Sequence, residues 1–592
     1  MKNLGLIGNC SIAGLVDDRG ELVWLCLPRF DGVPVFHSLL GQGTGEPGGG
    51  GFAIELEGFK SSRQSYDRNT AVLRTVLSGE SGEVEIVDFT PRFDNCGRMF
   101  RPQTVVRRIR ALSGWPRVKV RLRPRFDWGA TEPEITRGSN HVRYVGNGHT
   151  MRLTTDAPID LVLDEHVFNL DRPLHFVLGP DESLSAHPAE LTESFLRDTV
   201  QYWRDWVRRL AVPFEWQDAV IRAAITLKLC SYEPTGAIVA AVTTSLPEAP
   251  DSGRNWDYRF CWVRDAYFTV RALNSLAATR TLEHYFQWLM NAVADAGGGH
   301  IQPVLGIGLE RQLSESIAPG LQGYRGMGPV RIGNQAHEHF QHDTYGAIIV
   351  GAAPAFFDCR LHMHAGADAF RMLEDLGEQA WKLHDQPDAG IWELRTRARV
   401  HTSSSVMCWA ACDRLAKIAG HLGLASRQAF WRKRADAIRD KILEQAWSDK
   451  RQAFVESFGG ETLDASVLLM GEVGMLPPSE PRFAATVDRL SSALGRGAFM
   501  LRYEEADDFG EPEVGFNVCA FWRLDALARI GRTGEAREYF CDLLDARGHL
   551  GMMSEDTDFR TGEAWGNFPQ TYSMVGIING AMRLSRPWET EL

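Results

Sequence analysis

The hydrophobic pattern of this chain changes its period about a third of the way along. Up to about residue 180, β-branched and aromatic residues alternate with charged ones, as in Val118–Arg123 and Val84–Phe89. This period of two is typical of strands that bury one face. From Leu191 onward the apolar residues recur at helical spacing, beginning with the amphipathic segment 196–206. The chain therefore combines a strand-rich part with a helical part.

Each part has its own expected architecture. Several short strands with regular turn residues favour a β-sandwich domain over residues 1–190. Residues 191–212 are expected to form a helical linker. Residues 213–592 show almost no strand pattern and about twelve helical segments, which suggests an all-α (α/α)6 toroid of six antiparallel helix pairs. These segments lie near 217–231, 264–278, 279–295, 343–364, 366–384, 402–420, 426–446, 464–471, 481–493, 515–530, 531–545 and 570–584.

Charge and cysteine content exclude several classes of protein. Asp and Glu number 76 against 64 Lys and Arg, giving a net charge of −12, and this argues against nucleic acid or an anionic membrane as a partner. No stretch of 18 apolar residues is present, so we expect no membrane span and a cytoplasmic protein. The ten cysteines form no C-x-x-C pair, which predicts neither a zinc site nor a disulfide scaffold.

Unusual densities of polar and aromatic residues mark four loops of the helical part. The loop 255–265 places aromatic residues around Arg264 and Asp265, which suits a site for a polyhydroxylated ligand. The same two charged residues would equally serve as a buried ion pair that fixes the start of a helix. The other three loops are Asp388–Glu393, Arg502–Glu513 and Met553–Gly562. The last lacks the D-x-D-x-D-G spacing of a calcium loop, so no metal site is expected.

Acidic residues in these loops could support acid–base chemistry. Trp392 lies beside Glu393, and an apolar ring desolvates a carboxyl and raises its pKa toward the range of a general acid. Two carboxylates on opposite sides of a pocket suffice to hydrolyse an acetal: one protonates the leaving oxygen and the other deprotonates the attacking water. Neither G-x-S-x-G nor H-E-x-x-H is present to suggest other chemistry.

Four motifs in this order resemble glycoside hydrolase family 15, which holds glucoamylases, glucodextranases and microbial trehalases. They are Asn255–Ala266 (NWDYRFCWVRDA), Gly323–Asn334 (GYRGMGPVRIGN), Gly390–Glu393 (GIWE) and Gly566–Gln570 (GNFPQ). The stretch Gly8–Asp31 also resembles the β-sandwich domain of prokaryotic members. The resemblance covers nearly the whole chain, and it implies a β-sandwich followed by an (α/α)6 barrel with an inverting mechanism.

The resemblance assigns roles to individual residues. Glu393 corresponds to the general acid and Glu555 to the general base. In an inverting enzyme the two carboxyl groups are expected roughly 6.5–9.5 Å apart. The base has to be ionised, which Asp556 and Asp558 oppose unless they point away or meet basic partners. The expected substrate-binding residues are Tyr258, Trp262, Arg264, Asp265, Trp392 and Arg502.

Three positions depart from the usual family pattern. Ser405 replaces a basic residue, and Met327 and Gly328 replace Ser-Arg. In addition, the run Gly515–Cys519 replaces a more apolar one. These changes are expected to bear on the aglycone side of the site rather than on the catalytic pair.

The sequence therefore predicts an inverting, exo-acting hydrolase that releases β-glucose from the non-reducing end of an α-glucoside, without a cofactor. Trehalose, malto-oligosaccharides and isomalto-oligosaccharides are all candidate substrates. Two alternatives remain open: an inverting α-glucoside phosphorylase, which would need an anion site in place of the second carboxylate, and a catalytically silent sugar-binding protein.

Overall fold

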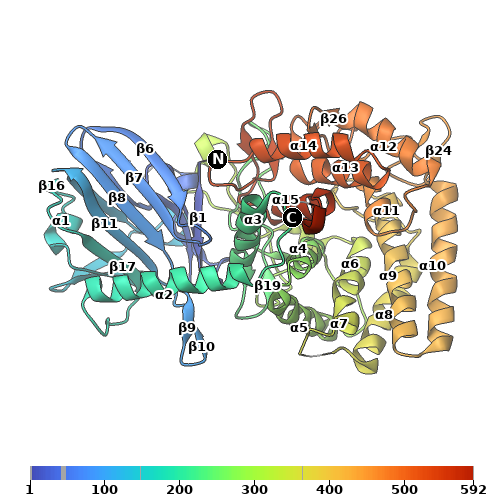
Figure 1. Cartoon of the computed structure of the whole chain (residues 1–592), viewed down its shortest axis with the longest axis horizontal. Helices are drawn as coiled ribbons and strands as arrows, with labels where there is room; N and C mark the ends of the chain where they lie inside the picture. The colour runs from blue at the N-terminus through green and yellow to red at the C-terminus, as the bar shows by residue number, and fades with distance from the viewer. Residues whose placement is uncertain (1–2, 42–48, 147, 363, 591–592) are drawn as a thin grey trace.

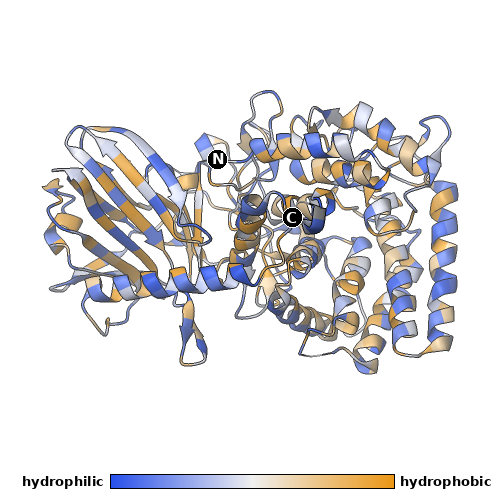
Figure 2. Cartoon of the chain, in the orientation of Figure 1, coloured by the Kyte–Doolittle hydropathy of each residue, from blue (hydrophilic) through white to orange (hydrophobic). Residues whose placement is uncertain are grey.

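The computed structural model describes residues 3–41, 49–146, 148–362 and 364–590. Its long strands lie in the first third of the chain and its long helices follow them (Figure 1). We refer to residues 3–180 as the N-terminal sheet region and to residues 217–584 as the helical region. Hydrophobic and hydrophilic residues alternate along the strands, as the period of two predicts (Figure 2).

Two antiparallel sheets make up most of the N-terminal sheet region. The first has the order β1-β2-β3-β5-β12-β16, with β4 paired to β3. These strands are β1 (Gly5–Gly8), β2 (Ala13–Val16), β3 (Leu22–Leu27), β4 (Val33–Phe36), β5 (Gly51–Leu56), β12 (Arg117–Arg123) and β16 (Phe168–Asn169). The second sheet has the order β13-β14-β15-β17-β11-β8-β7-β6. Its strands are β6 (Phe59–Tyr66), β7 (Leu73–Gly79), β8 (Gly82–Phe89), β11 (Val105–Gly114), β13 (Glu134–Arg137), β14 (His141–Gly146), β15 (His149–Thr155) and β17 (Leu174–Pro180).

The apolar faces of the two sheets bury each other. Phe52 of β5 meets Phe176 of β17 edge-on, with ring centroids 5.9 Å apart. Ile54 of β5 and Ile86 of β8 lie in the same hydrophobic cluster. The alternation is clearest in β12, where Val118, Val120 and Leu122 are buried and the charged residues between them are more exposed, so this strand keeps one face in the core.

Helix α2 (Pro188–Arg208) connects the sheets to the helical region. It begins at a proline, which fits the first turn of a helix because its missing N–H would have no partner there. Leu196, Trp203 and Val207 form its buried face, and the helix contacts β17. It runs along the sheets toward the helical region (Figure 1).

The helices of the helical region follow the predicted segments closely. They are α3 (Gln217–Leu229), α4 (Val263–Ser275), α5 (Thr279–Ala296), α6 (Asp343–Ala352), α7 (Pro354–Phe357), α8 (Ala367–Leu383), α9 (Thr402–His421), α10 (Ala425–Gln445), α11 (Leu469–Glu472), α12 (Pro481–Leu494), α13 (Asn517–Arg529), α14 (Thr533–Asp545) and α15 (Thr571–Leu584). The segment predicted as one helix over 343–364 divides instead into α6 and the short α7. Pro354, which has no N–H to donate, lies at the start of α7.

Six of these helices contact one another in a closed order. α4 contacts α6, α6 contacts α9, α9 contacts α11, α11 contacts α13, α13 contacts α15, and α15 contacts α4. α6 is buried along its whole length, whereas α10 buries only Trp431, Ala435, Ile438 and Ile442. A helix that is buried all round lies between other elements, and one with a single apolar stripe covers the outside. Of the helices within the described residues, none is both long enough and apolar enough to cross a membrane.

Candidate active site

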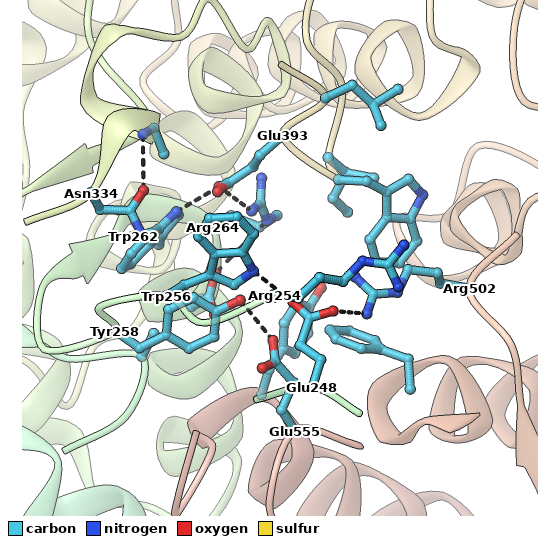
Figure 3. Close-up of a pocket in the computed structure, with 18 of the residues that line it drawn as sticks. Glu248, Arg254, Trp256, Tyr258, Trp262, Arg264, Asn334, Glu393, Arg502 and Glu555 are labelled. Atoms are coloured by element: carbon cyan, nitrogen blue, oxygen red, sulfur yellow. Dashed lines mark hydrogen bonds and ion pairs between the residues drawn. The ribbon is translucent and has the colours of Figure 1, made fainter. Parts of the chain in front are cut away.

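The N-terminal ends of the closed helices and the loops before them form one pocket (Figure 3). Arg264 and Asp265 come from the first turn of α4, Phe516 directly precedes α13, and Tyr572 begins α15. Every site residue predicted from the sequence lines this pocket: Tyr258, Trp262, Arg264, Asp265, Trp392, Glu393, Arg502 and Glu555. The structure thus brings together side chains from four loops that are far apart in the sequence.

The segment 257–262 has extended backbone that sorts its side chains onto two sides. The amides of Ala240 and Ala241 donate to the carbonyls of Phe260 and Tyr258, at 3.1 and 3.0 Å. Side chains alternate along such a segment. Tyr258 and Trp262 face the pocket, where their rings pack edge-on with centroids 5.3 Å apart. Arg259, which lies between them in sequence, is fully buried away from the pocket.

Glu393 is held by donors from the neighbouring motif. The indole N–H of Trp262 donates to Glu393 Oε1 at 2.6 Å, and Arg264 Nη2 lies 3.4 Å from the same oxygen. Glu393 has a φ of +61°, and Gly390 in the same loop has a φ of +68°. This left-handed backbone makes the GIWE loop a tight turn that projects the carboxylate into the pocket.

Trp392, which the sequence predicted to desolvate the adjacent Glu393, donates its own indole N–H to another carboxylate. It donates to Asp464 Oδ2 at 2.7 Å, and the Trp392 ring packs edge-on against Phe516. Trp392 therefore forms part of the pocket wall, and Asp464 and Phe516 hold its ring in place. The indole that hydrogen-bonds Glu393 belongs to Trp262.

Glu555 lies across the pocket from Glu393 (Figure 3). It is 2% exposed, and Tyr258 Oη donates to its Oε1 at 2.7 Å. Its Oε2 has no hydrogen-bond partner among the described residues. Burial, followed by the charge of Glu248, raises the pKa of Glu555 well above its ordinary value, although Arg502 and the Tyr258 hydrogen bond oppose this shift.

The acidic neighbours of Glu555 behave differently from each other. Asp558 turns to Arg560, whose Nε donates to it at 3.0 Å. Asp556 is fully buried, its nearest cation is Arg502 at 3.9 Å, and burial raises its pKa. The sequence predicted that Glu555 stays ionised if both neighbours point away or find basic partners, but only Asp558 clearly does so.

Arg264 and Asp265 differ in how far they are already engaged. Arg264 Nη1 contacts Gln341 at 3.0 Å and Asp343 at 3.1 Å. Asp265 has Arg264 as its ion-pair partner at 3.8 Å. Burial raises the pKa of Asp265 to about 6, although the charge of Arg264 lowers it. The two charges thus pair, and both residues also line the pocket, while sugar binding by them stays a prediction.

Arg502 is fixed by a buried carboxylate that sequence reasoning missed. It forms an ion pair with Glu248, and its guanidinium lies 4.7 Å from the centroid of Phe516. Glu248 is 3% exposed and also accepts from the indole N–H of Trp256 at 2.9 Å. The aromatic density of the motif around Trp256 could have pointed to that residue, whereas Glu248 carries no local signal.

Tyr572 is a second residue that the sequence did not single out. It lines the pocket at the start of α15, two residues after the GNFPQ motif, and is 5% exposed. Its hydroxyl has no hydrogen-bond partner among the described residues. A buried hydroxyl in a pocket wall is suited to bond a polar ligand.

The positions that depart from the family pattern lie outside the pocket wall, with one exception. Ser405 is fully buried in α9 and donates to the carbonyl of His384 at 2.6 Å. The carbonyl of Met327 accepts from Asn255 at 2.8 Å. Neither of them lines the pocket, nor does Gly328, whereas Phe516 of the run 515–519 does. An effect of Ser405, Met327 and Gly328 on the aglycone side therefore stays a prediction, and it would have to act through other residues.

The side chains that commonly ligate metal ions are dispersed in the part of the chain that the structure describes. No group of three or more His, Cys, Asp or Glu side chains is arranged there to hold a metal ion.

Comparison with known proteins supplies an independent line of evidence. The model of glycosyl hydrolases family 15 matches residues 216–582, and that of the trehalase-like N-terminal domain matches residues 1–162. The trehalase of Mycolicibacterium smegmatis is 32% identical over 100% of this chain and 92% of its own length. The trehalase of Thermoplasma volcanium is 31% identical over 98% of this chain and 93% of its own length.

A solved structure shares the fold. A bacterial glucoamylase complexed with acarbose superposes with a TM-score of 0.70 over 98% of this chain and 94% of its own, at 12% identity. The sheet-rich N-terminal part and the helical part therefore both belong to a known arrangement. With the family model covering most of the helical region and full-length relatives above 30% identity, the chain is a glycoside hydrolase that belongs to the glycosyl hydrolases of family 15.

Proposed function

We propose that this protein is an inverting, exo-acting hydrolase of α-glucosidic bonds that releases β-glucose from the non-reducing end. Glu393 is the general acid and Glu555 the general base. One observation carries this proposal: both carboxylates line the same pocket, and each accepts from a different aromatic donor, Trp262 or Tyr258. Those two rings pack against each other, so they hold the carboxylates in a fixed relation.

The roles follow from the contacts of each carboxylate. Glu393, with Arg264 beside it, protonates the glycosidic oxygen as the bond to the leaving sugar breaks. Glu555 takes a proton from the water that attacks the anomeric carbon from the opposite face. Its Oε2, which no described residue bonds, accepts that water proton. Burial and Glu248 oppose the ionised form of Glu555 by raising its pKa, whereas Arg502 and the hydrogen bond from Tyr258 favour that form.

We propose that Arg264, Asp265 and Tyr572 bind hydroxyls of the non-reducing glucose, with Tyr258, Trp262 and Trp392 as walls and Arg502 as a further contact. All of these side chains line the pocket. The name of the full-length relatives supports trehalose as the substrate. Maltose and isomaltose then serve as the comparison substrates.

The contacts of the pocket arginines argue against the phosphorylase alternative. Phosphate would need uncommitted positive charge near the anomeric carbon. However, the four arginines of the pocket wall are each paired with a carboxylate: Arg254 with Asp507, Arg264 with Asp343, Arg395 with Glu315 and Arg502 with Glu248. We expect turnover to be unchanged when phosphate is added or removed.

We also propose a β-sandwich for residues 1–190, a helical linker for residues 191–212 and an (α/α)6 barrel for residues 213–592. The closed order of contacts among α4, α6, α9, α11, α13 and α15 supports the barrel. The continuous course of α2 supports the linker.

Substitution of the two carboxylates tests the proposed function. Glu393→Gln and Glu555→Gln should each lower kcat by about 10²- to 10⁴-fold with trehalose, because each removes a proton-transfer group. Azide should restore part of the activity to Glu555→Gln by replacing the activated water. Glu511→Gln, an exposed change outside the pocket, is the control.

The anomer formed first decides the stereochemistry. Proton NMR of early turnover should show β-glucose, together with the anomer released from the leaving side. If the glucose whose anomeric carbon is attacked by water appeared first as the α-anomer, the enzyme would retain configuration. Full activity in either glutamine variant would exclude that residue from catalysis.

A further inference from the structure

Arg259 joins the segment 257–262 of the pocket to the N-terminal sheet region. Its Nη1 donates to the carbonyl of Gly32, in the turn between β3 and β4, at 2.6 Å, and lies 3.6 Å from Cys26 Sγ of β3. The guanidinium also lies 4.9 Å from the centroid of the Trp128 ring. All three partners belong to the N-terminal sheet region, so the arginine crosses from one region to the other.

The same guanidinium fixes the start of the segment 257–262 through Asp257. Its Nε and Nη2 donate to the two carboxylate oxygens of Asp257, at 2.9 and 2.7 Å. Asp257 also accepts from the amide of Gly333 at 3.2 Å. Arg259 is 1% exposed and Asp257 is fully buried. A two-pronged, buried arginine–carboxylate pair of this kind has a well-defined geometry.

Tyr258 lies between these two residues, and its side chain takes the opposite direction. Because the segment is extended, fixing Asp257 and Arg259 on one side fixes where Tyr258 emerges on the other. Its hydroxyl donates to Glu555, and its ring packs on Trp262, which donates to Glu393 (Figure 3). Both catalytic carboxylates are thus reached through one anchored segment.

We infer that Arg259 and Trp128 are positioning residues for catalysis: the N-terminal sheet region holds Tyr258 in register with Glu555 through them. This inference rests on the proposed role of Glu555. It assigns the N-terminal sheet region a part in the reaction although none of the residues described in that region lines the pocket. Displacement of a catalytic group by about 1 Å lowers turnover by up to about a hundredfold, so a small shift of the segment has a measurable effect.

A double-mutant cycle between Trp128 and Tyr258 tests the inference in the full-length protein. Trp128→Ala should lower kcat at least about tenfold, with a smaller change in KM. In the Tyr258→Phe background, where the hydroxyl is already absent, the same substitution should change kcat by less than about threefold. Trp128→Phe, which keeps a ring for the guanidinium, should restore most of the activity. Arg259→Lys, which loses the two-pronged pair, should behave like Trp128→Ala.

The pH profile gives a readout that loss of stability alone would not move. The Tyr258 hydrogen bond lowers the pKa of Glu555. Trp128→Ala and Tyr258→Phe should therefore shift the acidic limb of kcat/KM to higher pH in the same direction. The other groups that face Glu555, namely Glu248, Asp265, Arg502 and Asp556, are unchanged in both variants.

Glu310→Gln is the matched control. It removes a partly exposed ion pair of 2.8 Å between Glu310 of the helical region and Arg29, which lies in the same β3–β4 turn. Segment 257–262 is unchanged in this variant. It should leave kcat within about twofold of the wild type. Equal effects of Trp128→Ala in both backgrounds, or an unshifted acidic limb, would overturn the inference while Glu393→Gln and Glu555→Gln still abolish activity. Retained activity in those two variants would instead refute the proposed function.

Discussion

At the scale of single residues, the pocket separates groups that hold the site together from groups that can bind a sugar. Arg264 already contacts Gln341, Asp343 and Glu393, so its charge is largely compensated within the protein. Asp265 has one ion-pair contact, at 3.8 Å. Its carboxylate is consequently the better candidate to accept hydroxyl hydrogens from the bound glucose.

Asp265→Ala should lower kcat/KM strongly. The sugar hydroxyls that donate hydrogen bonds to this carboxylate would lose their acceptor in the transition state. The expected loss is about 2–4 kcal/mol, or roughly 30- to 1000-fold. Steady-state kinetics with trehalose measures it. A loss of less than about threefold would show that Asp265 does not contact the sugar.

The pH dependence of KM offers a second check on Asp265. Its pKa is raised to about 6, so the carboxylate gains a proton as the pH falls through about 6. The protonated group then accepts fewer hydrogen bonds from sugar hydroxyls. KM should therefore rise below pH 6 in the wild type. In Asp265→Asn, which has no such group, KM should be higher throughout but should not show this rise.

At the scale of secondary-structure elements, the closed order of helices depends on close backbone contact. Gly346 of α6 faces α9, and a Cβ atom at this position would lie 2.2 Å from the carbonyl oxygen of Met407. Since backbone of α9 cannot move aside as a flexible side chain can, any larger residue would push the two helices apart. α6 also carries Asp343, the partner of Arg264, so this packing also supports the pocket.

Gly346→Ala should therefore lower the free energy of unfolding by about 3 kcal/mol, the cost of overpacking a dense core. Urea unfolding followed by circular dichroism measures the change. Gly534→Ala in α14 is the control, since a Cβ there meets no atom within 4 Å. It should be neutral or raise stability by up to about 1 kcal/mol because alanine favours helix. Equal effects of the two substitutions would contradict the proposed contact.

At the scale of the whole molecule, a buried ionic cluster joins the two regions. Glu233 of the helical region contacts Arg92 of the N-terminal sheet region at 2.6 Å and Lys228 of α3 at 2.8 Å. The Arg92 and Lys228 side chains are 2% and 6% exposed. Burial raises the pKa of Glu233, but the charges of Lys228 and Arg92 outweigh it and hold the pKa below its ordinary value.

Glu233→Gln should lower stability by about 3 kcal/mol at neutral pH, because two buried cations lose their counter-charge. The depressed pKa of Glu233 makes its contribution fully present above about pH 4.3, the ordinary value for Glu. That contribution is lost as the pH falls toward the folded-state pKa. The difference in unfolding free energy between wild type and variant, measured by urea unfolding, should consequently be smaller at about pH 3.5 than at neutral pH.

Glu57→Gln provides the control for this cluster. Glu57 and Arg117 form a pair of 2.6 Å whose side chains are half exposed, and such pairs contribute little. Its unfolding free energy should stay within about 1 kcal/mol of the wild type at both pH values. A Glu233→Gln variant as stable as this control would show that the cluster does not join the two regions.

The sequence by itself determined most of the elements and eight residues of the pocket wall. Periods of two and 3.6 identify strands and helices because each element buries one face. Loop motifs such as Gly390–Glu393 and Asn255–Ala266 identified residues that the structure gathers around one pocket. The main error, a single helix over 343–364, arose where the apolar pattern continues past Pro354 although the backbone hydrogen bonds cannot.

Only the tertiary structure decided which partner each buried charge meets. Arg264 pairs with Asp343, 79 positions away, and Arg502 pairs with Glu248, 254 positions away. Arg259 reaches back 227 positions to the carbonyl of Gly32. Local patterns depend on neighbours within a few residues, whereas a buried charge is satisfied by whichever group the fold brings within about 3 Å of it. The chemistry of the pocket depends on these long-range pairs, and no local pattern in the sequence contains them.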